Sequence, residues 1–228
     1  AKCYFREGNS AMAMQDIAEA LKLNETNRKA YSLRSKINTK NKNYSEALLD
    51  VERGITLNPR DPRAYVMRSN IYLEQGNLDQ ALLECNRALE GNEFMKEVHV
   101  QRGLIQLQRK QAKQAIIDFS QALTIDPNYA EALWLRSQCY QDHREYERAI
   151  QDYDRLITLQ PDRLVDILER RAECYTRIKQ NHLALNDYNT ILGFNNANYK
   201  AYHQRGSVLL NLKDYEKAIA DFDSSIVL

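Results

Sequence analysis

Small and apolar residues return along this chain with a period of about 34 residues. The clearest column is alanine, spaced by 34, 34, 34, 34, 35 and 34 residues, and we assign it repeat position 20. Within each period the apolar residues fall on two stripes of about 3.6-residue spacing, separated by a short polar break such as residues 75–77. Each period therefore predicts two helices joined by a tight turn, stacked on copies of itself. The alanine column comprises Ala13, Ala47, Ala81, Ala115, Ala149, Ala184 and Ala218.

Two further columns predict how the helices of a pair pack. Position 8 always holds a small residue, and position 24 mostly holds a bulky apolar one. Small residues at positions 8 and 20 let two backbones approach closely, and the larger side chain at position 24 fills the space beside them. Pro59, Pro127 and Pro161 share position 32, where proline ends the second helix. Asp61 and Pro62 then indicate an N-cap and a first-turn proline of the next helix.

Two charged columns accompany the apolar ones. Arginine occupies position 7 in every repeat that contains this position, and an acidic residue always occupies position 23. These positions lie roughly level in an antiparallel hairpin, so they predict a ladder of ion pairs. The pairs can lie within each repeat, as Arg102 with Asp118, or between successive repeats, as Asp118 with Arg136. An arginine stripe that binds phosphate or an acidic peptide is the functional alternative.

The columns resemble those of the tetratricopeptide repeat, most specifically in Ala-Tyr-x-x-Arg-Gly at 201–206 and Tyr-Glu-Lys-Ala-Ile at 215–219. The resemblance, to repeats of the arginine-glycine type, implies an all-α, right-handed superhelical solenoid of stacked antiparallel helix pairs. It covers residues 1–228 as a single solenoid domain, with Leu164 as the one insertion. Because the chain begins and ends within helices, we expect a segment of a larger protein with further repeats or domains at both ends. The expected units are 1–27 (partial), 28–61, 62–95, 96–129, 130–163, 165–198 and 199–228 (partial).

Overall charge and cysteine usage narrow the classes of function. The chain has 32 Lys and Arg against 31 Asp and Glu, a net charge of +1, whereas proteins that bind duplex nucleic acid show a marked basic excess. No apolar run approaches the roughly 20 residues of a membrane span. Cys3, Cys139 and Cys174 share position 10 and Cys85 lies at position 24, so we expect four packed apolar thiols. Because the sequence has no Cys-x-x-Cys pair, we do not expect a zinc site. Reduced thiols are typical of proteins in the cytosol.

In the resembled family the first helices of the repeats line a concave groove, and this resemblance places the candidate partner-binding residues. The groove is expected to be basic at first, then apolar, then acidic. The groove residues include Lys36 and Lys40, then Met67, Val100, Leu104, Leu107, Trp134 and Leu135, then Glu131, Asp142, Asp166, Glu169 and Glu173 with Arg170 and Arg177.

Trp134, the only tryptophan, is the first candidate for a partner contact. Leu133 fills the position-4 core slot of that repeat, which is expected to turn Trp134 into the groove. Exposed apolar surface and tryptophan are both typical of interaction sites. The structural alternative is that Trp134 packs on Leu104 or Leu107 across the repeat boundary.

The basic N-terminal patch, which includes Lys36 and Lys40, has two interpretations. It either receives an acidic segment of a partner or is an ordinary solvated helix face.

No constellation of residues for catalysis is present in the sequence. Its four histidines fall at different repeat positions, and we find no Gly-rich phosphate loop, nucleophile elbow or metal-ligand spacing. We expect a scaffold without enzyme activity, metal or cofactor that binds peptide or helical segments of protein partners, and neither nucleic acid nor membrane. The resemblance suggests a large cytoplasmic, ciliary or cytoskeletal assembly. The alternatives are a substrate-recruiting arm of an enzyme whose catalytic domain lies outside this chain and recognition of single-stranded RNA.

Overall fold

The computed structural model describes residues 1–6 and 9–228, apart from the side chain of Arg6. These residues form helices and no strand, so the all-α prediction is confirmed. In the described ranges, no helix has both the length and the apolar character to span a bilayer. The helices are α1 (Lys2–Arg6), α2 (Ser10–Leu23), α3 (Arg28–Lys40), α4 (Tyr44–Leu57), α5 (Pro62–Glu74), α6 (Leu78–Gly91), α7 (Lys96–Gln108), α8 (Ala112–Ile125), α9 (Ala130–Asp142), α10 (Tyr146–Leu159), the 3-10 helix η1 (Pro161–Arg163), α11 (Leu164–Arg177), α12 (Asn181–Phe194), α13 (Tyr199–Asn211) and α14 (Tyr215–Val227).

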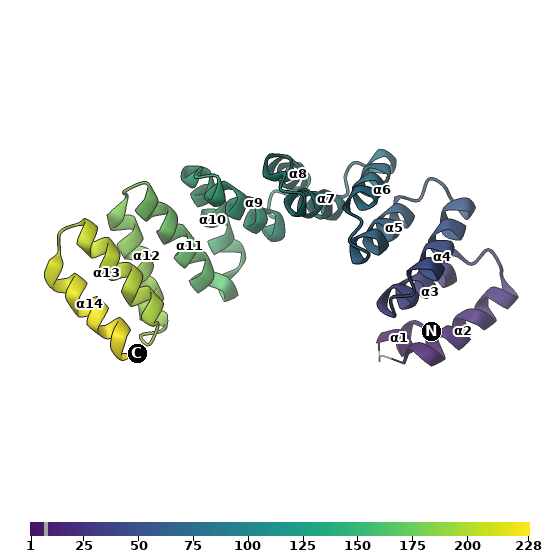
Figure 1. Cartoon of the computed structure of the whole chain (residues 1–228), viewed down its shortest axis with the longest axis horizontal. Coiled ribbons are helices and arrows are strands. Elements are labelled where there is room, and N and C mark those ends of the chain that lie inside the picture. The colour runs from purple at the N-terminus through teal and green to yellow at the C-terminus, as the bar shows by residue number, and fades with distance from the viewer. Residues whose placement is uncertain (7–8) are drawn as a thin grey trace. The chain divides into compact units, whose positions relative to one another are not determined.

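The helices pack in consecutive pairs, as the 34-residue period predicts (Figure 1). The pairs include α3 with α4, α5 with α6, α9 with α10, α11 with α12 and α13 with α14. The first helix of a pair also packs on the second helix of the pair before it, as α5 does on α4 and α13 on α12. The chain divides into two compact units, residues 1–118 and 119–228.

The alanine column lies in the core, because all seven of its members are fully buried. Small apolar clusters around these alanines join one repeat to the next. One cluster brings Ala47 and Val51 of α4 against Ile71 of α5. Another brings Tyr188 of α12 against Val208 of α13. Each hairpin therefore buries its apolar flank on a neighbour, which is how stacking stabilises the array.

Positions 8 and 24 are matched in size within a repeat. Gly206 on α13 lies so close to Phe222 on α14 that a Cβ at residue 206 would lie 3.0 Å from Phe222 Cε1. Where position 24 holds the smaller Cys85, position 8 holds Ser69, and Ser69 Oγ lies 3.2 Å from Cys85 Sγ. The close approach predicted from these columns is confirmed.

Local chemistry sets the helix starts. The Asp61 carboxylate accepts a hydrogen bond from the backbone N–H of Arg63 at 3.1 Å, and Pro62 opens α5, as predicted. Asparagine side chains cap α3, α6 and α13 in a similar way. These caps satisfy backbone N–H groups that have no partner within the helix.

In the six hairpin turns that the structure describes, position 15 lies in the left-handed backbone region. Five of these six residues are not glycine: Lys110, for example, has φ 60° and Lys213 has φ 64°, whereas Gly76 has φ 73°. The N–H of Lys110 donates to the Leu107 carbonyl at 2.9 Å, and the next N–H donates to the Gln106 carbonyl at 2.8 Å. This pattern is a Schellman C-cap, whose left-handed residue is usually glycine. The described position-15 residues with positive φ are Lys42, Gly76, Lys110, Arg144, Lys179 and Lys213.

The burial of the cysteines follows the prediction at three positions and departs from it at one. The cysteines at residues 85, 139 and 174 are buried, but Cys3 is exposed. Helix α1 has five residues and packs through Tyr4 and Phe5, which leaves Cys3 on its outer side. The expectation that all four thiols pack as apolar side chains is therefore wrong for Cys3.

Candidate functional site

Each position-7 arginine pairs with the position-23 acid of its own repeat. The distances from Nη2 to the carboxylate oxygen are between 2.6 and 2.8 Å. The hydrogen bond to Asp50 raises the pKa of the Arg34 guanidinium. With every guanidinium of this column held by a carboxylate, the ladder has a structural role and lies within repeats. The pairs are Arg34–Asp50, Arg68–Glu84, Arg102–Asp118, Arg136–Asp152, Arg171–Asp187 and Arg205–Asp221.

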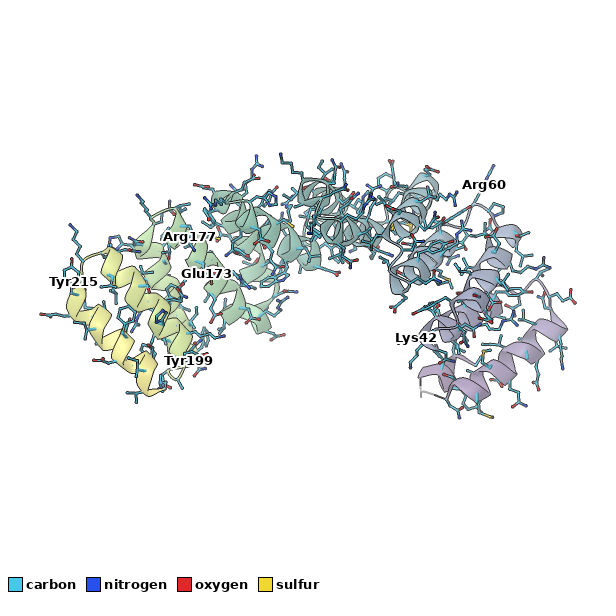
Figure 2. The ribbon with its side chains drawn as sticks, in the orientation of Figure 1. Lys42, Arg60, Glu173, Arg177, Tyr199 and Tyr215 are labelled. Carbon is cyan, nitrogen blue, oxygen red and sulfur yellow. The ribbon has the colours of Figure 1, made fainter. Side chains whose placement is uncertain are left out.

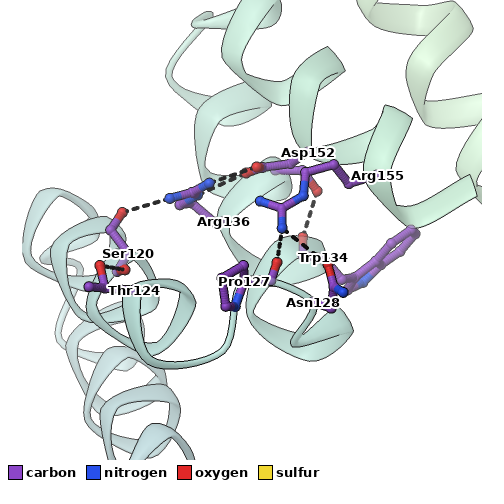
Figure 3. A network of polar contacts seen from close by, with 9 residues as sticks. Ser120, Thr124, Pro127, Asn128, Trp134, Arg136, Asp152 and Arg155 are labelled. Atoms are coloured by element: carbon purple, nitrogen blue, oxygen red, sulfur yellow. Dashed lines mark hydrogen bonds and ion pairs between the residues drawn. The ribbon is translucent and has the colours of Figure 1, made fainter. Parts of the chain in front are cut away.

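Five of these arginines have a second partner at position 25 of the preceding repeat. Arg136 Nη1 donates to Ser120 Oγ at 3.0 Å while the same guanidinium binds Asp152 (Figure 3). Each such guanidinium ties its own hairpin to the repeat before it. Sequence reasoning missed this column because the five partner residues share only a side-chain oxygen that accepts a hydrogen bond. The other pairs are Arg68 with Glu52, Arg102 with Asn86, Arg171 with Asp154 and Arg205 with Asn189.

The first candidate binding surface lies in unit 1–118, between the first helices α3 and α5. A cavity of about 410 Å³, here called the N-terminal cavity, brings together three of the predicted residues, Lys36, Lys40 and Met67. Lys36 and Lys40 are exposed and Met67 is half-buried. The lysines of this cavity, including Lys42, form no ion pair with a carboxylate in the described part of the chain. The lining residues are Ser35, Lys36, Thr39, Lys40, Lys42, Met67, Asn70 and Glu74.

The predicted apolar residues of α7 divide between core and surface. Leu104 is exposed and Leu107 is half-buried. Val100, however, is only 2% exposed. The neighbouring Val98 and His99 are buried too, whereas Glu97 in the same turn is exposed. Val100 is therefore a core residue here and not a groove residue.

Trp134 lies half-buried on α9, while Leu133 beside it is fully buried, as predicted. The guanidinium carbon of Arg163 lies 4.1 Å from the centroid of the Trp134 ring, and the Tyr153 ring meets it edge-on with centroids 6.1 Å apart. Arg163 belongs to η1, the turn that accommodates the insertion at Leu164. One face of the tryptophan is thus covered by the chain itself, a contact that the sequence columns did not reveal. Leu135 is half-buried.

A second cavity, of about 260 Å³, lies in unit 119–228 and is here called the C-terminal cavity. It contains two of the predicted acidic residues, Glu169 and Glu173 on α11. Figure 2 labels Glu173 and also Tyr199, which begins α13. Sequence reasoning missed Tyr188 of α12, because position 24 was assigned to the core of its own repeat. The lining residues are Glu169, Glu173, Tyr188, Tyr199, Lys200, Ala201, His203, Gln204 and Ser225.

Family models described as tetratricopeptide repeats match residues 39–96, 97–129, 130–163 and 199–226. The chain belongs to the tetratricopeptide repeat family. No curated protein matched this tetratricopeptide repeat chain in a sequence search.

Solved structures of other tetratricopeptide repeat proteins share the fold. The C-terminal part of a repeat-containing protein from Cytophaga hutchinsonii is 16% identical, with a TM-score of 0.82 and coverage of 100% of this chain and 93% of that one. A tetratricopeptide repeat protein from Parabacteroides merdae is 20% identical, with a TM-score of 0.63 and coverage of 99% and 89%. YrrB, described as having an unusual peptide-binding site, is 16% identical, with a TM-score of 0.65 and coverage of 82% and 96%. These identities establish a common fold.

The two cavities offer this tetratricopeptide repeat protein binding chemistry of opposite sign. The N-terminal cavity presents lysine ammonium groups beside a thioether, and the C-terminal cavity presents carboxylates beside tyrosine rings. Within the described residues, no group of three or more His, Cys, Asp and Glu side chains has the geometry to hold a metal ion.

Proposed function

We propose that this tetratricopeptide repeat chain is a non-catalytic protein-interaction module. Its binding surface is the face formed by the first helices of successive repeats, and its ligands are segments of partner proteins. The observation that carries this proposal is the N-terminal cavity, where Lys36, Lys40 and Lys42 share an open recess with no ion-pair partner among the described residues. The position-7 arginines, in contrast, are all paired.

The lining of the N-terminal cavity specifies the chemistry of its ligand. The ammonium groups of Lys36, Lys40 and Lys42 attract carboxylates, and the amide of Asn70 can donate to or accept from a peptide backbone. Met67 offers a polarisable side chain that adapts to different apolar partners. The ligand that fits best is an acidic segment with an apolar side chain next to its carboxylates.

Further apolar contacts are proposed in each unit separately. In unit 1–118 they come from Leu104 and Leu107 on α7, and in unit 119–228 from Trp134 and Leu135 on α9. Because Arg163 covers one face of Trp134, a ligand here either stacks on the remaining surface or displaces the guanidinium. Tryptophan contacts at interfaces are often worth about 2 kcal/mol or more, so Trp134→Ala is expected to weaken such binding measurably. YrrB, which shares this fold and is described as having an unusual peptide-binding site, supports the proposal that this chain binds peptide segments.

Selection from a random peptide library displayed on phage, followed by fluorescence anisotropy with the selected peptide, tests the proposal. The expected peptides carry Asp or Glu beside Leu, Met or Phe. The double variant Lys36→Gln/Lys40→Gln should bind the selected peptide about tenfold more weakly, because it loses two charge-assisted contacts. The matched control is Lys110→Gln/Lys113→Gln, which removes two exposed lysines of the same unit outside the cavity. A library that yields no binder, or equal affinity for both double variants, would contradict the proposal.

A further inference from the structure

The C-terminal cavity holds two carboxylates that are only lightly engaged. Glu173 accepts a hydrogen bond from Gln141 Nε2 at 2.8 Å, and its oxygen lies 3.8 Å from Arg170 Nη1. Glu169 accepts one long hydrogen bond, from Asn198 Nδ2 at 3.4 Å. Two carboxylates present about eight lone-pair sites in total, so most of their accepting capacity is unused by these contacts.

A largely buried tyrosine whose hydroxyl has no hydrogen-bond partner among the described residues also lines this cavity. Tyr188 is 2% exposed, yet its hydroxyl forms no hydrogen bond with any described residue. Burial, together with the charges of Glu173 and Glu169, raises the pKa of Tyr188, so its hydroxyl stays protonated. The hydroxyl of a largely buried tyrosine ordinarily finds a hydrogen-bond partner, so this one, in a residue at the wall of a cavity, is available to a ligand.

The repeat before it shows how this hydroxyl is usually satisfied. Tyr153 occupies the same position 24, and its hydroxyl donates to Gln141 Oε1 at 2.9 Å. The residue equivalent to Gln141 beside Tyr188 is Thr176, whose hydroxyl donates to the Ala172 carbonyl within its own helix. The repeat at 165–198 thus lacks the acceptor that the repeat at 130–163 supplies. Tyr188, whose hydroxyl is left without that acceptor, lines the same cavity as the two carboxylates.

The remaining walls favour a planar cation. Tyr199 is exposed at the first residue of α13, where its ring offers an aromatic face. Gln204 and Ser225 add oxygen atoms that accept hydrogen bonds. Lys200 and His203 also line the cavity and are exposed, and Lys200 opposes a cationic ligand. A volume of about 260 Å³ is below the roughly 300–1,000 Å³ of sites for drug-sized ligands, and it suits a single long side chain.

We propose that the C-terminal cavity binds an arginine side chain of a partner segment, with Glu169, Glu173 and the Tyr188 hydroxyl around its guanidinium. This inference rests on the proposed function, because the arginine belongs to the segment that the first-helix face holds. Arginine fits better than lysine, because its planar fork can satisfy both carboxylates while stacking on Tyr199. An ammonium group presents three donors from one point and does not stack in the same way.

Nuclear magnetic resonance titration of the ¹⁵N-labelled chain with N-acetyl-arginine amide tests the cavity without a partner protein. Saturable shifts of the backbone amides of Ala201 and Tyr188 are expected. The double variant Glu169→Gln/Glu173→Gln should weaken this binding about tenfold or more, and Lys200→Gln should strengthen it. The citrulline analogue, which keeps the shape but lacks the charge, should give no saturable shift, and the lysine analogue should bind more weakly than arginine.

The control variant Glu147→Gln/Glu216→Gln removes two exposed acids of the same unit that do not line the cavity, and it should bind arginine amide as the natural chain does. Absence of a saturable shift, equal binding of citrulline, or undiminished binding to Glu169→Gln/Glu173→Gln would each overturn the inference. The proposed function would survive those results, because it is tested by peptide selection on the N-terminal cavity. Conversely, if the chain binds arginine amide but the library yields no peptide, arginine binding in the C-terminal cavity would be supported and the proposed function would be contradicted.

Discussion

The guanidinium of Arg136 binds the carboxylate of Asp152 with two parallel hydrogen bonds, Nε to Oδ2 at 2.9 Å and Nη2 to Oδ1 at 2.7 Å. The carboxylate side chain is 4% exposed and the guanidinium side chain 18%. Since the pair joins α9 to α10, it fixes the register of one hairpin. A buried carboxylate is tolerated in such a position because a matching cation lies against it.

Replacing Asp152 with Asn should lower the free energy of unfolding by about 2–3 kcal/mol, because a charge-assisted bidentate pair is lost from a largely buried site. Urea unfolding followed by circular dichroism measures the change. Asp142→Asn, which alters an exposed acid at the end of α9, serves as the control and should change stability by no more than about 0.5 kcal/mol. Equal effects of the two substitutions would show that the ladder adds nothing specific.

Alanine substitution at two helical glycines should have opposite effects. Gly206→Ala puts a methyl group 3.0 Å from the Phe222 ring, so strain of about 1–3 kcal/mol is expected to exceed the gain in helix propensity. Gly54→Ala meets no atom within 4 Å, so it should stabilise the chain by about 0.8–1 kcal/mol. Thermal unfolding of both variants measures the signs. Partial recovery in Gly206→Ala/Phe222→Leu would locate the strain at this contact.

Glycine should be a better residue than lysine in the hairpin turns. Lys110 has φ 60°, a conformation that costs residues with a Cβ roughly 1–2 kcal/mol, while glycine loses more freedom on folding. Lys110→Gly is therefore expected to raise stability by about 0.5–1 kcal/mol. The reciprocal Gly76→Lys should lower it by a similar amount. Chemical denaturation of both variants decides the point, and a loss of stability in Lys110→Gly would show that the lysine side chain contributes more than its backbone strain.

Alkylation should distinguish one thiol from the other three. Burial raises the pKa of the Cys85 and Cys139 thiols to about 11 and that of Cys174 to about 12. At about pH 8 the reactive thiolate of these groups is therefore scarce, and access is blocked as well. Iodoacetamide should label exposed Cys3 alone in the native chain and all four thiols in guanidinium chloride, as mass spectrometry can show. Labelling of Cys174 at the rate of Cys3 would contradict the burial.

The hairpin architecture could be predicted from the sequence because it depends on residue size at fixed spacing. The alanine column marks the closest approach of two helices, and no other small residue recurs as strictly. The Arg136–Asp152 pair was likewise visible as two columns. The sequence did not reveal whether each arginine pairs within its own repeat or between repeats, since both arrangements place an acid near the guanidinium. Only the coordinates of α9 and α10 distinguish them.

The candidate site was predicted less completely, for reasons that particular residues show. Lys36, Lys40 and Met67 do line one cavity, because repeat position alone fixes which helix face they occupy. The burial of Val100 depends on how α7 is covered, and Arg163 reaches Trp134 through an irregular turn. Neither effect follows a 34-residue period, so a column could not reveal them.

The second partner of the position-7 arginines makes the seams between neighbouring repeats unequal. Arg171 meets the carboxylate of Asp154 and Arg136 the hydroxyl of Ser120, whereas the corresponding residue before Arg34 is Ala18, whose methyl group accepts nothing. When the array is heated or pulled, opening is therefore expected to begin where α3 rests on α2. A single exchange at residue 18, from alanine to aspartate, would be enough to fasten that seam like the others.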